Sequence, residues 1–148
     1  MESQESNDLY FTCSLIEFIG RETSNKRSYI TEKLGIEGLT WIYDNAQVLH
    51  CENMNAVCDE VVAEYKIELG NYPHTTGYLP RIFGLGRTYS YLIKDLISLE
   101  DTQKLMEKTY EVMTSWLVED ITNFESSLYT ENPSYIKACY EEGKILWD

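Results

Sequence analysis

The stretch from Ser98 to Leu128 constrains the fold more than any other part of the chain. Apolar residues recur in it at steps of three and four, which places them along one face of a helix about 40 Å long. Ser98 followed three residues later by Asp101 predicts a capping box at its start. A helix this long and one-sided must be covered by others, so the stretch predicts a bundle packed around a central helix at about residues 99–128. The stripe consists of Leu105, Met106, Thr109, Val112, Met113, Trp116, Leu117, Ile121, Phe124 and Leu128.

Capping residues and glycines predict the helices that surround this stretch. Gly35 separates two short helices, and Asn53 caps the helix that follows them. Gly84 and Gly86 either weaken the opening turns of a later helix or let another backbone pack closely against it. The expected helices span residues 8 to 20 or 23, 26–34, 37–46, 54–65, 80–96 and 133–142, the last between Asn132 and Gly143, with Val48-Leu49-His50 as a short apolar connector that could be extended.

The length of the chain favours a single domain. A chain of 148 residues can bury about two-thirds of its unfolded surface without metal or disulfide support. We therefore expect one all-α domain at 1–148, a bundle of about seven helices with little or no sheet. A loop at 70–79 divides it into an N-terminal half, 8–69, and a C-terminal half, 80–148.

The charge of the chain narrows the kinds of partner it can bind. It contains 12 lysines and arginines and 25 aspartates and glutamates, which gives a formal charge of −13. Such a surface repels phosphate backbones and anionic lipids and attracts basic proteins. A helix-turn-helix reading around Gly35 fails as well, because residues 37–46 offer no basic side chain to DNA bases. We expect a basic protein partner, and neither direct nucleic-acid binding nor a membrane.

Cysteine usage and the start of the sequence indicate the compartment. The four cysteines are scattered without close pairing, and the first residues lack the basic and apolar regions of a signal peptide. No apolar run approaches the roughly 18 residues of a membrane span. We therefore expect a cytoplasmic protein with reduced thiols.

Two kinds of surface are expected to contact a partner. The predicted loop gathers Tyr72, His74 and Tyr78, and loops carry function more often than helices do. Runs of carboxylates form the outer faces of two predicted helices, where they are either solvated or half of a docking surface. These acidic residues are Glu52, Asp59, Glu60 and Glu64 on one helix and Glu107 and Glu111 on the other. Trp41 and Trp147, if exposed, would favour a dimer or a partner-binding patch.

The residues that could carry chemistry lack the spacing that chemistry needs. His50, Cys51, Cys58 and His74 do not form the close pairs of a structural zinc site. Adjacent carboxylates on a helix point about 100° apart, so they cannot act together as acid and base on one substrate bond. Glu17, between two apolar neighbours, is expected to point to water. We therefore predict no catalytic residue, no cofactor and no metal.

Asp120 is the most interesting acid, because it lies at the margin of the apolar stripe. If it is buried, it needs a partner such as Arg81 or Arg87, or its pKa rises. An enzyme site in a groove near Asp120, Arg87 and His74 is therefore kept as an alternative.

Several segments between Phe11 and Val62 carry a resemblance to a known group of proteins. They are residues 11–17 (FTCSLIE), 33–39 (KLGIEGL), Tyr43, 48–50 (VLH) and 59–62 (DEVV). They look like a group of small uncharacterised bacterial domains, some of which are encoded beside ADP-ribosyltransferase-like toxins. The likeness covers about a third of the chain. It implies a bacterial or phage context and an antitoxin-like, protein-binding role, and it assigns no catalytic residue.

These observations favour an acidic module that works by protein–protein contact, as an antitoxin, immunity or inhibitor component. The surplus of tyrosines, 12 in all, supports this reading, because tyrosine supplies large contact area at low entropic cost. The first alternative is a nucleic-acid-mimicking inhibitor, whose carboxylates imitate phosphates. Mimicry predicts a steep loss of affinity with salt, whereas a tyrosine-anchored interface should lose little.

Overall fold

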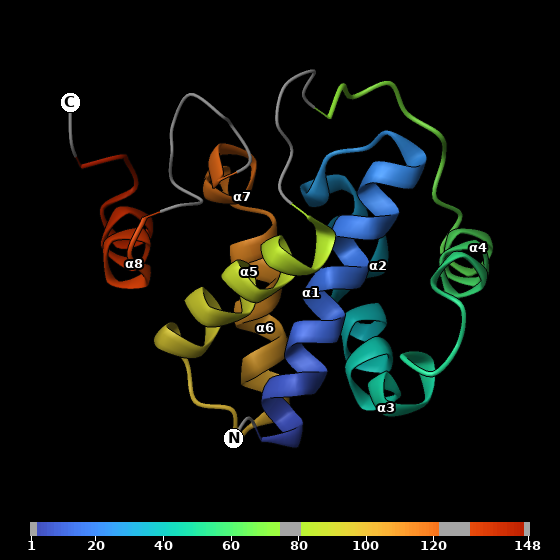
Figure 1. Cartoon of the computed structure of the whole chain (residues 1–148), viewed down its shortest axis with the longest axis horizontal. Helices are drawn as coiled ribbons and strands as arrows, with labels where there is room; N and C mark the ends of the chain where they lie inside the picture. The colour runs from blue at the N-terminus through green and yellow to red at the C-terminus, as the bar shows by residue number, and fades with distance from the viewer. Residues whose placement is uncertain (1–2, 75–80, 122–130, 147–148) are drawn as a thin grey trace.

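The computed structural model describes residues 3–74, 81–121 and 131–146, and in these ranges it contains eight α-helices and no β-strand. The all-α prediction is therefore confirmed. None of the helices in these ranges has both the length and the apolar character needed to cross a membrane. The helices are α1 (Gln4–Thr23), α2 (Arg27–Asp44), α3 (Ala46–Leu49), α4 (Met54–Glu64), α5 (Ile82–Leu96), α6 (Thr102–Met113), α7 (Trp116–Ile121) and α8 (Pro133–Glu142) (Figure 1).

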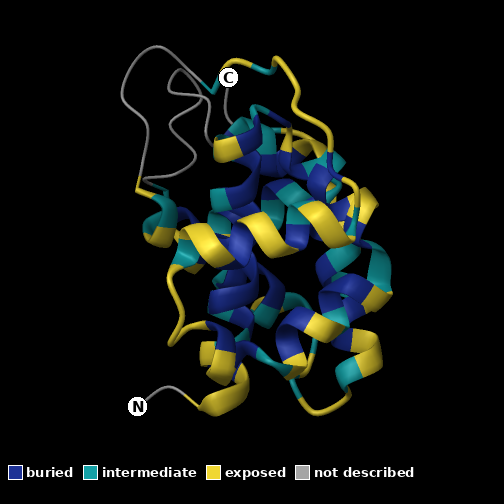
Figure 2. Ribbon diagram, turned by 90° about the vertical axis from the view of Figure 1, so that its right-hand side faces the viewer, coloured by how far each residue is buried: buried dark blue, intermediate teal, exposed yellow. Residues whose placement is uncertain are grey.

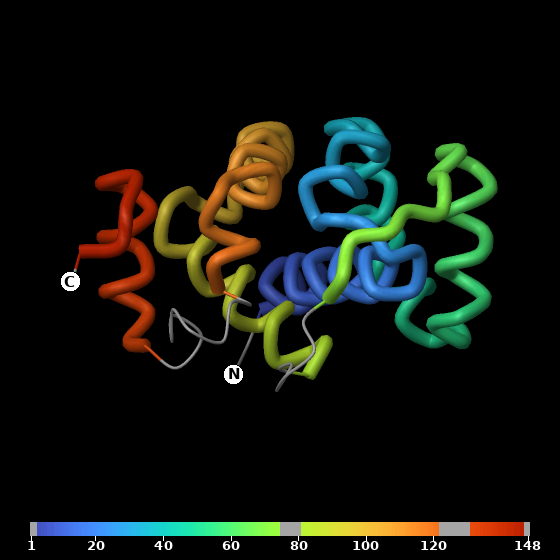
Figure 3. The backbone as a smooth tube through the Cα atoms, turned by 90° about the horizontal axis from the view of Figure 1, so that it is seen from above, coloured from blue at the N-terminus to red at the C-terminus, as the bar shows by residue number. Residues whose placement is uncertain are grey.

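The helix at the centre of the bundle is α1. It is buried along most of its length, and α2, α3, α4 and α5 all pack against it. The helices α6 and α8 form a second layer around this centre: α6 packs on α2 and α5, and α8 packs on α5. Seen from above, α4 and α8 occupy opposite ends of the molecule (Figure 3). Buried residues line the inward faces of the helices, and exposed residues lie on the outer faces (Figure 2).

The prediction of one long central helix at 99–128 is wrong. The chain there forms α6 and α7, with a break at Thr114 and Ser115. The Ser115 hydroxyl donates to the Val112 carbonyl at 2.6 Å, and the Thr114 hydroxyl donates to the Tyr110 carbonyl at 2.8 Å. The backbone leaves the helical conformation at Thr114, where φ is −100° and ψ is 2°, and the Ser115 amide donates to the Val112 carbonyl at 3.0 Å in the tighter turn that closes α6. Residues 122–128 of the predicted helix lie outside the described ranges.

The start of this segment also differs from the predicted capping box. Asp101 is the N-cap of α6, and its carboxylate accepts from the Lys104 amide at 3.1 Å. The Ser98 hydroxyl instead accepts from the Glu100 amide at 3.1 Å, in the turn before the helix. The helix therefore begins three residues later than the pair of polar residues suggested.

Three further helix ends follow the predicted local signals, whereas α1 begins at Gln4 behind the N-cap Ser3, four residues before the predicted start at residue 8. Asn53 caps α4, Asn132 caps α8 with Pro133 at its first position, and Gly143 closes α8 in the left-handed region. The break predicted at Gly35 is present as a kink inside α2, where φ is 66° and ψ is 178°. The connector predicted at 48–50 is not extended, because Ala46–Leu49 forms α3.

Candidate functional site

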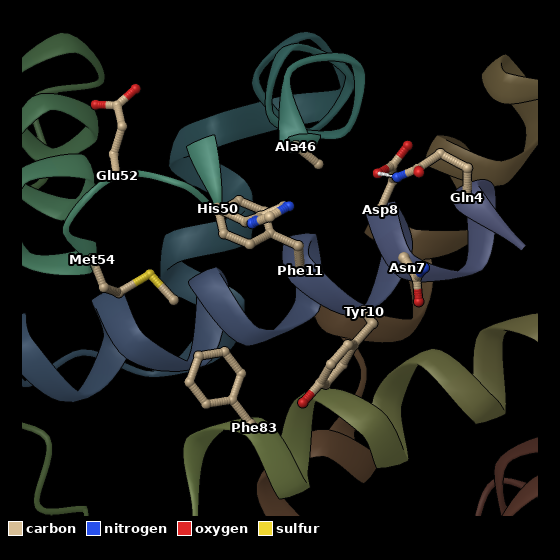
Figure 4. Close-up of a pocket in the computed structure, with 10 residues that line it drawn as sticks. All are labelled: Gln4, Asn7, Asp8, Tyr10, Phe11, Ala46, His50, Glu52, Met54 and Phe83. Atoms are coloured by element: carbon tan, nitrogen blue, oxygen red, sulfur yellow. Dashed lines mark hydrogen bonds between the residues drawn. The ribbon is translucent and has the colours of Figure 1, made fainter. Parts of the chain in front are cut away.

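A groove of about 520 Å³ lies between α1, α3, the start of α4 and α5 (Figure 4). Its volume and its mixture of aromatic, apolar and a few polar groups are typical of a ligand-binding site. Half of the lining residues come from α1, and α5 contributes Phe83. The lining residues are Gln4, Asn7, Asp8, Tyr10, Phe11, Ala46, His50, Glu52, Met54 and Phe83.

Aromatic rings from two helices form the apolar part of the groove. Tyr10 of α1 meets Phe83 of α5 edge to face, with ring centroids 6.1 Å apart. The Arg87 guanidinium covers the Tyr10 ring at 4.7 Å from its centroid. Phe11 is buried beneath the groove, while Phe83 remains 51% exposed. Phe83 of α5 is thus exposed to solvent beside the ring of Tyr10.

Carboxylates stand at both ends of the groove. Asp8 lies at one end, where it accepts from the Gln4 amide at 2.7 Å, and Glu52 lies at the other (Figure 4). Burial raises the pKa of Tyr43 to about 12, and the negative charges of Asp8, Glu5 and Asp44 add to this shift. The groove therefore combines aromatic and apolar groups with the imidazole of His50, which lies over Phe11, and it has a carboxylate at either end (Figure 4).

Tyr10 and Phe83 were not among the residues singled out in the sequence. Both are large aromatic residues inside helices that the sequence predicts, at residues 8 to 20 or 23 and 80–96. A helix that places an aromatic ring off its buried face needs something else to cover that ring. Trp41, which was predicted to favour a dimer or a partner-binding patch if exposed, is 40% exposed on α2. Trp147, named with it, lies outside the described residues.

The acidic residues predicted on the fourth helix are exposed, but they occupy different places. Glu52 lines the groove, whereas Glu60 and Glu64 line a second pocket of about 320 Å³ together with Trp41 and others. Asp59 is exposed on α4. The predicted acidic face is thus divided between two concave surfaces.

The acidic residues predicted on α6 already have partners within the chain. Glu107 is exposed and accepts from the Gln103 amide at 2.9 Å. Glu111 accepts from Lys108 at 3.1 Å and from the Tyr140 hydroxyl of α8. The bond from Tyr140 is the main cause that lowers the pKa of Glu111. This face is therefore less open to an external cation than the face of α4.

Two residues of the predicted contact loop fix the described part of the loop to the turn between α1 and α2. The His74 ring nitrogen Nε2 lies 3.0 Å from the Gly20 carbonyl oxygen and 2.8 Å from that of Asn25. Tyr72 packs edge to face on His74 at 5.1 Å, and its backbone amide donates to the Ser24 carbonyl at 2.8 Å. Both side chains are half-buried. Tyr78, the third predicted residue, lies outside the described ranges.

The expectation that Glu17 points to water is wrong. Its side chain is fully buried, and its carboxylate accepts from Arg27 at 2.6 and 2.8 Å, from Arg21 at 2.7 Å and from the Tyr89 hydroxyl at 2.8 Å. Arg27 is paired on its other side with Glu119 of α7 at 2.7 Å. Burial alone would raise the pKa of Glu17, but the hydrogen bonds and charges of Arg27 and Arg21 lower it overall.

The three residues of the alternative enzyme site have different surroundings. Asp120 is half-buried, and burial together with the charge of Glu119 raises its pKa. Arg87 stacks on Tyr10 at the groove, and His74 contacts the turn between α1 and α2. Among the described residues, no group of three or more His, Cys, Asp or Glu side chains could hold a metal ion.

No family model, no curated protein and no solved structure matches the chain. The function must therefore be inferred from the groove, the second pocket and the charges around them.

Proposed function

We propose that the chain is an acidic protein-binding module of the antitoxin, immunity or inhibitor kind. In this proposal the groove between α1, α3 and α5 receives a basic, amphipathic segment of the partner. The observation that carries it is the arrangement of the groove: aromatic and apolar groups, with His50 among them, lie between the carboxylates of Asp8 and Glu52.

The positions of the apolar and acidic groups in the groove define what kind of partner segment it would bind. Large apolar side chains of the partner would pack on Phe83, Tyr10 and Met54, which line the groove. Lysine or arginine before and after them would approach Asp8 and Glu52. Aromatic residues in such positions commonly contribute most of the binding energy of an interface, while peripheral charges determine orientation and encounter rate.

The charge of the whole chain supports the same partner. A formal charge of −13 produces a field that accelerates encounter with basic proteins and disfavours acidic competitors. The resemblance of residues 11–62 to bacterial domains encoded beside toxins is consistent with this role.

Affinity capture from the native host tests the proposal if three versions of the chain are compared. Phe83→Ser removes the exposed ring of the groove, whereas Leu69→Ser removes a side chain that is 81% exposed and does not line it. We expect a basic protein on the wild type and on Leu69→Ser, and at least about a tenfold loss with Phe83→Ser, which equals about 1.4 kcal/mol. A partner that is retained by Phe83→Ser, or lost equally from both variants, would contradict the proposal.

The salt dependence of the captured complex distinguishes this mode from nucleic-acid mimicry. Binding through the groove buries apolar surface, so its affinity should fall only modestly between 50 and 200 mM salt. Mimicry of a phosphate backbone would lose about 10³-fold or more over the same range.

A further inference from the structure

The second pocket, of about 320 Å³, is separate from the groove and shares no lining residue with it. Its lining residues come from α2 and from the end of α4, and α4 lies at the end of the molecule opposite α8 (Figures 1 and 3). Its lining residues are Trp41, Glu60, Val61, Glu64 and Tyr65. It therefore combines two aromatic rings with two carboxylates at an exposed edge of the bundle.

The aromatic walls are held in place by the packing of α2 against the end of α4. A Cβ atom on Gly38 would lie 3.2 Å from two carbon atoms of the Tyr65 ring, so this ring rests directly on the backbone of α2. Trp41 follows Gly38 by three residues on the same helix, which places the two rings within about one helical turn of each other. Trp41 is 40% exposed, so a ligand can reach its ring.

Within the part of the chain that the structure describes, no cationic side chain pairs with the carboxylates of the pocket. Glu60 and Glu64 are four residues apart on α4 and therefore share one face. Burial raises the pKa of Tyr65, and the charges of Glu64 and Glu37 add to the shift, which places a third acid nearby. Over the described residues, none of these three carboxylates forms an ion pair or a side-chain hydrogen bond.

We infer that this pocket binds the guanidinium group of an arginine side chain from the protein partner. A planar guanidinium can stack on Trp41 or Tyr65 and at the same time donate to the carboxylates of Glu60 and Glu64. A lysine ammonium would satisfy the charge but would use the aromatic faces less fully. The inference rests on the proposed function only in taking the arginine from a basic protein.

Titration with a blocked tripeptide, acetyl-Gly-Arg-Gly-amide, followed by ¹⁵N NMR tests the inference directly. The indole N–H of Trp41, assigned with Trp41→Phe, should shift saturably. The citrulline tripeptide has nearly the same shape but no charge, and we expect it to bind at least about fivefold more weakly because it lacks the cation–π and ionic contributions.

Two double variants with the same change of net charge complete the test. Glu60→Gln with Glu64→Gln should weaken arginine binding at least about fivefold, because both ionic partners are lost. Glu141→Gln with Glu142→Gln removes two exposed charges from α8, at the far end of the molecule, and should leave binding unchanged. All four residues are exposed, so both proteins should fold, which circular dichroism can check.

Three results would overturn the inference: no shift at Trp41, equal binding of the citrulline tripeptide, or equal loss in both double variants. The outcome is independent of the Phe83→Ser comparison, because Phe83 does not line this pocket. If the tripeptide binds at Trp41 but no partner protein is captured, the proposed function is refuted and the arginine site stands. If a partner is captured through the groove but the tripeptide does not bind, only the arginine site is refuted.

Discussion

Glu17 joins four helices through its hydrogen bonds and those of its partner. Its carboxylate on α1 binds Arg27 of α2 and Tyr89 of α5, and Arg27 continues to Glu119 of α7. The Arg27 backbone amide also donates to Glu119 at 3.0 Å. A buried charge is tolerated only when it is paired and hydrogen-bonded in this way. The cluster thus fixes the relative positions of helices that apolar packing alone would leave less defined.

Replacing Glu17 by glutamine should therefore lower the free energy of unfolding by about 3–5 kcal/mol, because Arg27 keeps its burial and loses its main counter-charge. Urea denaturation at pH 7 measures this loss. Glu107→Gln is the matched control, since Glu107 is exposed and its replacement should change stability by less than about 0.5 kcal/mol. Equal effects of the two substitutions would show that the buried cluster contributes no more than a surface charge.

The pH dependence of stability should change in the same variant. Because the folded pKa of Glu17 is lowered from its ordinary value of 4.5, this carboxylate stabilises the fold fully above that value. Its contribution is lost as the pH falls through the lower, folded pKa. The difference in unfolding free energy between wild type and Glu17→Gln should thus be constant from about pH 5.5 to 7 and shrink below pH 4.5. A difference that grows on acidification would contradict the assignment.

The sequence could reveal only part of this cluster. Arg21 lies four residues after Glu17, a spacing that places both on one helical face. Tyr89 lies 72 residues away, and Glu119 reaches Arg27 across 92 residues. Neighbours at such distances depend on how the helices pack, so the usual expectation of a solvated glutamate was reasonable and wrong.

At the scale of helices, the contact between α1 and α5 depends on Gly86. A Cβ atom there would lie 2.0 Å from the Ser14 hydroxyl oxygen and 2.9 Å from the Ser14 Cα. The second of these atoms belongs to the backbone and cannot rotate away. The interpretation that this glycine permits close backbone packing is therefore confirmed.

Gly86→Ala should destabilise the fold by about 1–3 kcal/mol, the usual cost of overpacking, although alanine favours the helical conformation. Thermal unfolding followed by circular dichroism measures the effect. Asp95→Ala on the exposed face of the same helix should leave the unfolding free energy within about 0.5 kcal/mol of wild type. Stabilisation by Gly86→Ala would mean that α5 can move away from α1 without loss.

Helix ends can be predicted from the sequence where the capping group is local, as at Asn53, Asn132 and Gly143. The sequence does not predict where a helix is interrupted. The apolar period runs through Thr114 and Ser115, and Leu117 and Ile121 remain buried in α7 even though the helix is interrupted. Periodicity reports which side chains face the core, whereas the turn at Thr114 and Ser115 interrupts the backbone and leaves the apolar pattern intact.

At the scale of the molecule, neither concave surface could be predicted from the pattern of the chain. The groove requires Phe83 of α5 to face Tyr10 of α1, and the second pocket requires Trp41 of α2 to face the end of α4. What the composition did indicate is the sign of the field around both, because acids outnumber bases by 25 to 12. The shape of the surface follows from packing, while its charge follows from composition.

That charge should also reduce the stability of the free protein. Few of the acids are paired among the described residues, and like charges such as Glu60 and Glu64, four apart on α4, repel each other. Adding sodium chloride from about 10 to 200 mM should therefore raise the unfolding midpoint, because salt screens exposed charges more than the buried Glu17–Arg27 pair. At low salt, Glu60→Gln with Glu64→Gln should add about 0.2–0.5 kcal/mol to the unfolding free energy.

The gain from this double variant should shrink at 200 mM salt, where the Debye length falls below about 8 Å and approaches the spacing of about 5–6 Å between side chains four residues apart. Denaturation at both salt concentrations measures it. A midpoint that falls with salt would show that surface ion pairs outweigh the repulsion. If repulsion prevails, the acids of α4 cost the free protein stability, and an arginine seated between them would recover that cost on binding, since it supplies the missing counter-charge.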